Sequence, residues 1–185
     1  MELGEARSTR IAYHQGKIEF MTPLWEHENR NWQIGRLIIL LIEELNLEYE
    51  LGGSVTLKRP ERAAGKELDS CYYIQNAALV RGNTELDLTS LPPPDLAVEV
   101  DITNSSLNQL DLYADIGVPE VWRYDGQQLQ IYQLQNTAYL PCSNSPTFPF
   151  LSTSQVEEFL PDCKTLGVAT SVRRWQECVT NQNDQ

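Results

Sequence analysis

The segment Asp95–Ile102, with the sequence D-L-A-V-E-V-D-I, decides the fold of this chain. Side chains of an extended segment point alternately to opposite faces, so this one predicts a strand with two different faces. One face would be apolar and would carry Leu96, Val98, Val100 and Ile102. The other would carry Ala97 and three carboxylates, which belong to Asp95, Glu99 and Asp101.

The acidic face calls for a positive partner. Neighbouring carboxylates on it would lie about 6.6 Å apart, and their mutual repulsion, if they were buried together, would raise their pKa values. A divalent cation with oxygen ligands is the simplest partner for such a face. The alternative is an edge strand whose acidic face is wet, where water screens the charges.

The residues after this strand predict a helix and then further strands. Asn104-Ser105-Ser106 offers helix N-caps, and Gly117 with Pro119 ends the helix. We expect strands at 120–124 and 129–133, with a shorter one at 138–140. A strand, a helix and another strand in this order imply a right-handed crossover and at least one parallel pair.

The residues before the acidic segment predict a hairpin, a helix and two or three strands. The hairpin would pair 10–14 with 17–21, and an apolar helix would follow over 27–45. Extended segments are expected at 48–51, 54–58 and 69–74, followed by a polar loop that ends in three prolines. Two C-terminal helices, at 156–160 and 166–179, precede a polar tail over 180–185.

We therefore predict an α/β (α+β) fold, a mixed β-sheet flanked by helices, in a single domain over residues 1–185. Within this fold Asp69 is a second acid of interest. If the strand that it begins pairs beside the acidic one, Asp69 and Glu99 converge on one ion. A metal ion in such a place lowers the pKa of bound water and neutralises charge on a phosphoryl group.

Charge and composition limit the partners. The chain has 14 Lys and Arg against 26 Asp and Glu, a formal net charge of −12. A local basic patch, a metal ion or dimer geometry would have to attract a nucleic acid to it. The four cysteines form no C-x-x-C pair, which disfavours a zinc knuckle. With no long apolar run and a charged N-terminal segment, we expect no membrane span and a cytoplasmic protein.

Four stretches of the chain resemble the Uma-type putative restriction endonuclease family of the PD-(D/E)xK nuclease superfamily, and the resemblance extends over about residues 10–178. The sharpest are L-P-P-P-D-L-A-V-E-V-D-I-T-N-S-S (91–106) and Y-A-D-I-G-V-P-E-V-W-R-Y-D-G (113–126). M-T-P-L-W-E-H-E (21–28) and E-L-D-S-C-Y-Y-I (67–74) are similar as well. The resemblance implies a restriction-endonuclease-like fold, Mg²⁺- or Mn²⁺-dependent hydrolysis of DNA phosphodiester bonds, and a homodimer.

The resemblance also implies site residues. Asp69 and Glu99 match the two metal-binding acids, with the Val100 carbonyl as a further ligand. His27 would orient an acid, contact phosphate or merely cap the first helix, and Glu28 would supply a first-helix carboxylate. For Asp95 the expected role is to fix the entry of the strand by hydrogen bonding to the proline-rich loop, rather than to bind the metal.

One departure from the family concerns the catalytic cation. Asp101 stands where the superfamily has a lysine, and Gln109 stands where many members of the family that the chain resembles carry one on the next helix. Glutamine positions water but cannot stabilise an anion as an ammonium does. Lys66 or Arg123 is a candidate replacement.

Two main interpretations remain open at this stage. One is an active metal-dependent endonuclease. The other is a catalytically degraded nuclease scaffold that binds nucleic acid or protein as a homodimer, and an unrelated carboxylate hydrolase is a distant third. A structure with Asp69 and Glu99 on opposite sides, or each neutralised by its own basic side chain with no room for an ion, would contradict the first interpretation.

Overall fold

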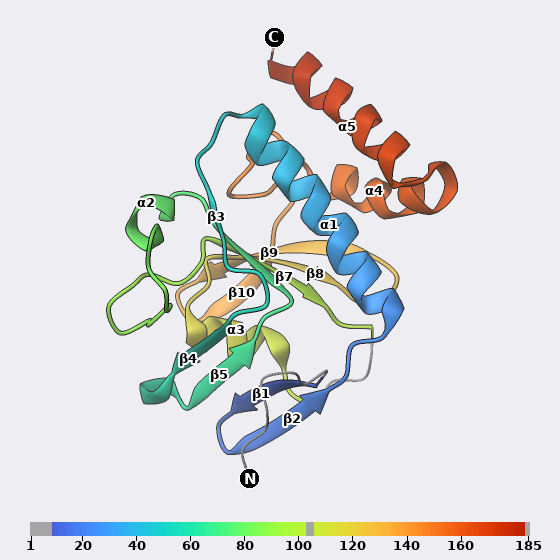
Figure 1. Cartoon of the computed structure of the whole chain (residues 1–185). Coiled ribbons are helices and arrows are strands. Elements are labelled where there is room, and N and C mark those ends of the chain that lie inside the picture. The colour runs from blue at the N-terminus through green and yellow to red at the C-terminus, as the bar shows by residue number, and fades with distance from the viewer. Residues whose placement is uncertain (1–8, 103–105, 184–185) are drawn as a thin grey trace.

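The computed structural model describes residues 9–102 and 106–183 of the chain. Within them the predicted α/β (α+β) class is confirmed, but the strands form two sheets where one was expected (Figure 1). The larger sheet has six strands, in the order β10 (Ala138–Pro141), β9 (Leu129–Gln135), β8 (Glu120–Tyr124), β7 (Leu96–Val100), β6 (Ser70–Tyr73) and β3 (Glu50–Leu51). Its β7–β8 pair is parallel and its other pairs are antiparallel.

The smaller sheet has four strands and was not predicted as a separate sheet. Its order is β2 (Lys17–Met21), β1 (Arg10–His14), β5 (Ala64–Glu67) and β4 (Thr56–Arg59). The β1–β2 hairpin has the predicted bounds, but β5 and the short 3-10 turn η1 (Pro60–Arg62) were missed. The sequence of β5, A-G-K-E, has low intrinsic strand propensity, so its conformation comes from pairing with β1 and β4.

Helices cover the larger sheet on both faces. α1 (Trp25–Glu44) packs on one face together with α4 (Thr153–Leu166) and α5 (Val168–Asn183). On the other face lie α3 (Gln109–Ile116) and the smaller sheet. As predicted, α3 is the crossover between β7 and β8, and Gly117 ends it in the left-handed conformation, with φ at +91°.

The two faces of strand β7 determine where the acidic side chains near it point. Leu96, Val98 and Val100 enter the core beneath α1, whereas Ala97 belongs to the core beside α3. Glu99 shares the Ala97 face, so its carboxylate points toward α3 and the smaller sheet. Because the strand ends at Val100, Asp95 and Asp101 lie just outside it.

Several further expectations are corrected. The short helix α2 (Ala77–Val80) lies in the expected loop, and α5 runs into the expected polar tail. Trp25 and Trp32 of α1 are 79% and 71% exposed in this chain, so neither belongs to its core. The expected N-caps Asn104 and Ser105 lie outside the described residues, and Asn108 occupies the cap position of α3.

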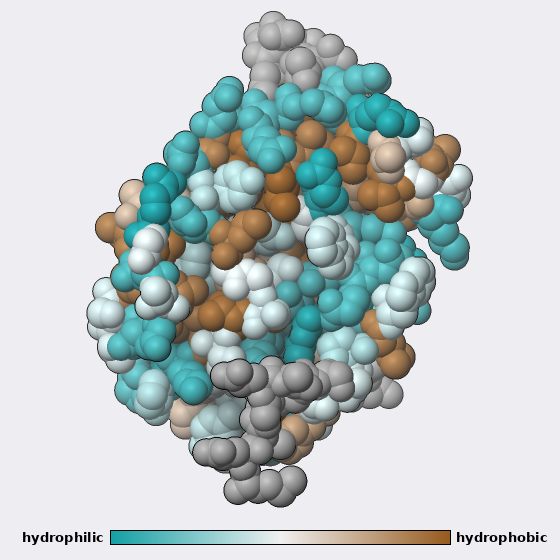
Figure 2. Space-filling view, viewed as in Figure 1, coloured by the Kyte–Doolittle hydropathy of each residue, from teal (hydrophilic) through white to brown (hydrophobic). Residues whose placement is uncertain are grey.

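The surface is mostly polar on the side seen in Figure 2, where apolar residues appear in small groups between hydrophilic ones. None of the helices described here has the length and apolar character needed to cross a bilayer.

Candidate active site

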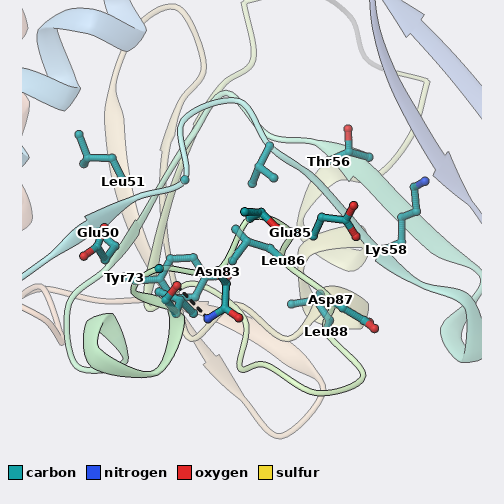
Figure 3. A pocket seen from close by; sticks show the side chains of 15 residues that line it. Glu50, Leu51, Thr56, Lys58, Tyr73, Asn83, Glu85, Leu86, Asp87 and Leu88 are labelled. Carbon is teal, nitrogen blue, oxygen red and sulfur yellow. Dashed lines mark hydrogen bonds between the residues drawn. The ribbon is translucent and has the colours of Figure 1, made fainter.

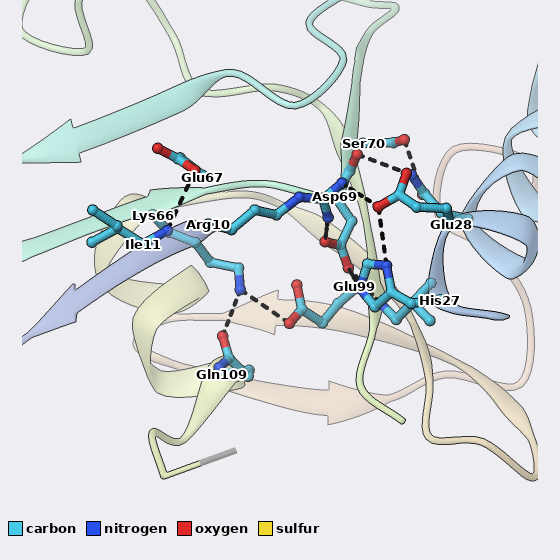
Figure 4. A network of polar contacts seen from close by, with 12 residues as sticks. Arg10, Ile11, His27, Glu28, Lys66, Glu67, Asp69, Ser70, Glu99 and Gln109 are labelled. Carbon is cyan, nitrogen blue, oxygen red and sulfur yellow. Dashed lines mark hydrogen bonds and ion pairs between the residues drawn. The ribbon is translucent and has the colours of Figure 1, made fainter. Parts of the chain in front are cut away.

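The two sheets meet at Asp69. Strand β5 belongs to the smaller sheet and β6 to the larger one, and only Leu68 and Asp69 separate them in the chain. Leu68 is fully buried and anchors this passage through a backbone hydrogen bond to Val55. The passage therefore places Asp69 beside the end of β7, at the junction between the sheets (Figure 4).

Asp69 is held by donors from several parts of the fold. Its Oδ2 accepts the backbone N–H of Val100 at 2.8 Å, and its Oδ1 accepts a hydrogen bond from Arg10. The ring Nε2 of His27 lies 3.2 Å from Oδ2. Burial raises the pKa of Asp69, but the contact with His27 and the charges of Lys66 and Arg10 outweigh it and bring the pKa below its usual value.

Glu99 has a different set of partners. Its Oε1 accepts from the Lys66 ammonium at 3.0 Å and its Oε2 accepts from the Tyr113 hydroxyl at 2.8 Å. Burial and the nearby charge of Asp69 raise the pKa of Glu99, against the opposing effect of Lys66. The Lys66 ammonium also donates to Gln109 Oε1 at 2.7 Å. Both Lys66 and Gln109 are buried, so this cation is fixed in place.

The first turn of α1 supplies His27 and Glu28. The imidazole is 3% exposed and lies between two carboxylates, with Nδ1 3.3 Å from Glu28 Oε1. Burial lowers the pKa of His27, but the contacts with Asp69 and Glu28 raise it by more, so the net shift is upward. Arg10 also donates to Glu28 Oε1, at 2.7 Å, and so bridges Glu28 and Asp69. His27 is thus placed to orient Asp69 and is not a helix cap.

A cavity of about 100 Å³ opens beside these groups. Its walls include Glu99, Val100, Lys66, Gln109 and Arg10. A larger hollow of about 640 Å³ lies elsewhere, between β3, β4 and the loop after α2 (Figure 3). Three carboxylates line that hollow, from Glu50, Glu85 and Asp87, so it suits an anionic substrate less well than the cavity at Lys66.

Asp95 and Asp101 do not converge with Glu99. Asp95 accepts from the backbone N–H groups of Ile74 and Asn76 and from the Asn76 side chain, at 2.5–3.0 Å. It therefore holds the turn after β6, and not the proline-rich loop as expected. Asp101 borders the cavity, but its carboxylate pairs with Arg123 at 2.7 Å. This pairing leaves Lys66, rather than Arg123, as the cation next to Glu99.

The oxygen donors at this junction are of the type that a hard cation prefers, but they are already paired. All four carboxylate oxygens of Asp69 and Glu99 accept from protein groups or lie against them. In the part of the chain that the structure describes, no three His, Cys, Asp or Glu side chains are arranged as a ready metal cluster. Arg10 lies between Asp69 and Glu28, so a divalent ion bound there would take the place of its guanidinium.

Two residues of the site were missed at the sequence level. Arg10 reaches Asp69 from β1, across 59 positions of sequence, and no local pattern marks that pairing. Tyr113 lies one helical turn after Gln109, on the same side of α3, and this spacing could have indicated it. Both residues hold a carboxylate in place, so they define the geometry of the acids.

Comparison with known proteins bears on the family and the fold. A family model described as "Uma2: Putative restriction endonuclease" matches residues 1–169. A solved structure of a putative nuclease belonging to DUF820, from Anabaena variabilis ATCC 29413, is similar with a TM-score of 0.54 at 16% identity. The similarity covers 80% of this chain and 89% of that one, and it shows a shared fold. No curated protein matches the chain.

Proposed function

The chain belongs to the Uma2 family of putative restriction endonucleases, and from that premise we propose that it is a metal-dependent endonuclease that hydrolyses phosphodiester bonds of DNA. One observation carries the proposal. Asp69 and Glu99, from different strands, lie at the same junction, where Asp69 accepts the N–H of the residue that follows Glu99. A buried ammonium and a cavity adjoin Glu99.

In this proposal the metal is Mg²⁺ or Mn²⁺, held by Asp69, Glu99 and the Val100 carbonyl. When bound, it would supply positive charge for the phosphate and an acidic bound water. Lys66 would neutralise charge on the phosphoryl oxygens from the cavity wall. Gln109 accepts from Lys66 and so directs the ammonium, while His27 and Tyr113 orient Asp69 and Glu99.

A second candidate function is a degraded nuclease scaffold that binds nucleic acid or protein without cutting. The ion pairing favours it, because Arg10 and Lys66 already compensate the two acids without any metal. The cavity beside Glu99 and Val100 favours the enzyme, because it leaves room next to Glu99. We include the homodimer and the cytoplasmic location in the proposal for either function.

The deciding experiment combines cleavage with calorimetry. Purified protein is incubated with plasmid and oligonucleotide DNA in Mg²⁺ or Mn²⁺, and the same ions are titrated calorimetrically. We expect metal-dependent nicking that Asp69→Asn and Glu99→Gln abolish. Glu26→Gln is the matched control, because Glu26 shares the first turn of α1 with His27 and Glu28 but points to solvent. Metal binding without cleavage, or neither, would support the scaffold instead.

A further inference from the structure

The smaller sheet has an outer face that turns away from α3. Its register aligns Lys58, Gly65, Tyr13 and Ile18 across the four strands in one row. The next row contains Thr56, Glu67, Ile11 and Phe20. The alternate positions, such as Leu57 and Ala12, are buried against α3. We call the two rows the outer face.

Aromatic and apolar side chains stand on this face in contact with solvent. Tyr13 is 38% exposed, Ile18 59% and Phe20 63%. Gly65 adds no side chain between Tyr13 and Lys58, and a hollow of about 590 Å³ lies there. A Cβ at Gly65 would meet its nearest atoms at 3.7 Å, so no close packing requires the glycine.

The same sheet is basic in an acidic protein. Strands β1, β2, β4 and β5, together with η1, carry six Lys and Arg against three Glu, a net charge of +3, whereas the whole chain is −12. The side chains of Lys17, Lys58 and Arg62 are exposed, and within residues 9–102 and 106–183 these side chains make no hydrogen bond or ion pair.

Arg10, Arg59 and Lys66 alternate with the two rows and are bonded on the opposite side of the sheet. The two rows themselves contain one cation, Lys58, and one acid, Glu67, and the exposed Lys17 and Arg62 stand at the ends of the strands. These three exposed cations are the positive charge that the sheet offers to a phosphate backbone.

The outer face is continuous with the candidate active site. Ile11, Lys66 and Glu67 line both the hollow on the outer face and the cavity beside Glu99. A polymer lying across the outer face can therefore pass over the β1–β5 pair into the site without leaving the protein surface.

We propose that the outer face binds an extended single-stranded segment of nucleic acid and leads it to the site. Its bases would stack on Tyr13 and Phe20, and its phosphates would lie near Lys58. Exposed rings on a sheet bind unpaired bases, whereas a duplex keeps its base faces stacked inside. This inference rests on the proposed function and names single strands or unpaired regions as its substrate class.

The test measures binding separately from cutting. Anisotropy of a labelled single-stranded 20-mer and of its duplex is recorded with EDTA present. We expect the single strand to bind more tightly, and Tyr13→Ala or Phe20→Ala to weaken it by at least about fivefold. Lys58→Glu should weaken it further at low salt, and Gly65→Val should fill the hollow with a similar loss. Trp32→Ala is the control, because Trp32 is an exposed ring on α1, outside the smaller sheet.

Unchanged affinity in the Tyr13 and Phe20 variants would overturn the inference, as would equal binding of the duplex. A dimer in sedimentation that dissociates with Phe20→Ala, with no loss of DNA binding in the monomer, would assign the face to a second copy and also overturn the inference.

The small substrate bis(4-nitrophenyl) phosphate separates this inference from the proposed function. Tyr13→Ala should keep its hydrolysis while losing oligonucleotide cleavage. If the wild type cuts neither substrate but binds the single strand through Tyr13 and Phe20, the result supports nucleic-acid binding on the outer face and rejects the proposed endonuclease activity.

Discussion

The Lys66 ammonium lies 2.7 Å from the side-chain oxygen of Gln109, so a β-strand and a helix bring a cation and an amide to the same point beside Glu99. A lysine at 109 would bring its own ammonium to nearly this point, since its side chain is one bond longer than that of glutamine. A lysine at either position, 66 or 109, would thus place a positive charge at nearly the same point beside Glu99.

Exchanging the two side chains tests this relationship. Lys66→Gln should lower DNA cleavage by roughly 100-fold or more, because the phosphate loses its cation. It should also destabilise the fold by about 3 kcal/mol, because Glu99 would be buried without its ion pair. Adding Gln109→Lys to that variant should restore much of the cleavage activity and much of the stability. The cleavage rate measures the first and urea unfolding the second. Recovery of stability without any recovery of cleavage would show that Lys66 is structural only.

Removing Arg10 should make the acids more accessible to metal. In Arg10→Met the guanidinium no longer competes for Asp69 and Glu28, so Mn²⁺ affinity should rise about tenfold or more in calorimetry. Without metal this variant should melt at a lower temperature than the wild type, and saturating Mn²⁺ should raise its melting temperature more. Arg36→Met, an exposed arginine on α1, controls for loss of charge. Equal metal affinity in both variants would place the ion away from Asp69.

Asp95 should matter for stability and not for metal binding. Asp95→Ala leaves the N–H groups of Ile74 and Asn76 without their acceptor, which should lower the free energy of unfolding by about 2–4 kcal/mol. The folded fraction should bind Mn²⁺ as the wild type does. Loss of metal binding in a variant that remains folded would assign Asp95 to the site.

The cysteines should differ in reactivity according to burial. Burial raises the pKa of the Cys71 thiol to about 12, so it stays protonated and shielded at pH 8. Cys178 is exposed and should react with iodoacetamide first. Mass spectrometry of the partly labelled folded protein reads the order directly. Early labelling of Cys71 would indicate that the edge of the larger sheet opens readily.

The local sequence patterns predicted the elements that they define by themselves. Alternation at 95–102 and the capping residues around 117 gave β7, α3 and β8, and their adjacency to β6 brought Asp69 to Glu99. β5 was missed because Ala64 and Gly65 favour no strand by themselves. The partners of the acids could not be predicted, because Arg10 and Lys66 reach them only after two sheets have packed together.

The passage from one sheet to the other at Leu68 and Asp69 has a mechanical consequence. Arg10 and Lys66 stand on the smaller sheet, whereas Glu99 stands on the larger one and Glu28 on the helix that covers it. Any shift of the smaller sheet against the larger one would therefore move both cations together relative to Glu99 and Glu28. Arg10 and Lys66 thus clamp the smaller sheet onto the larger one and onto α1, so the charges of the acidic centre also hold the two sheets in register.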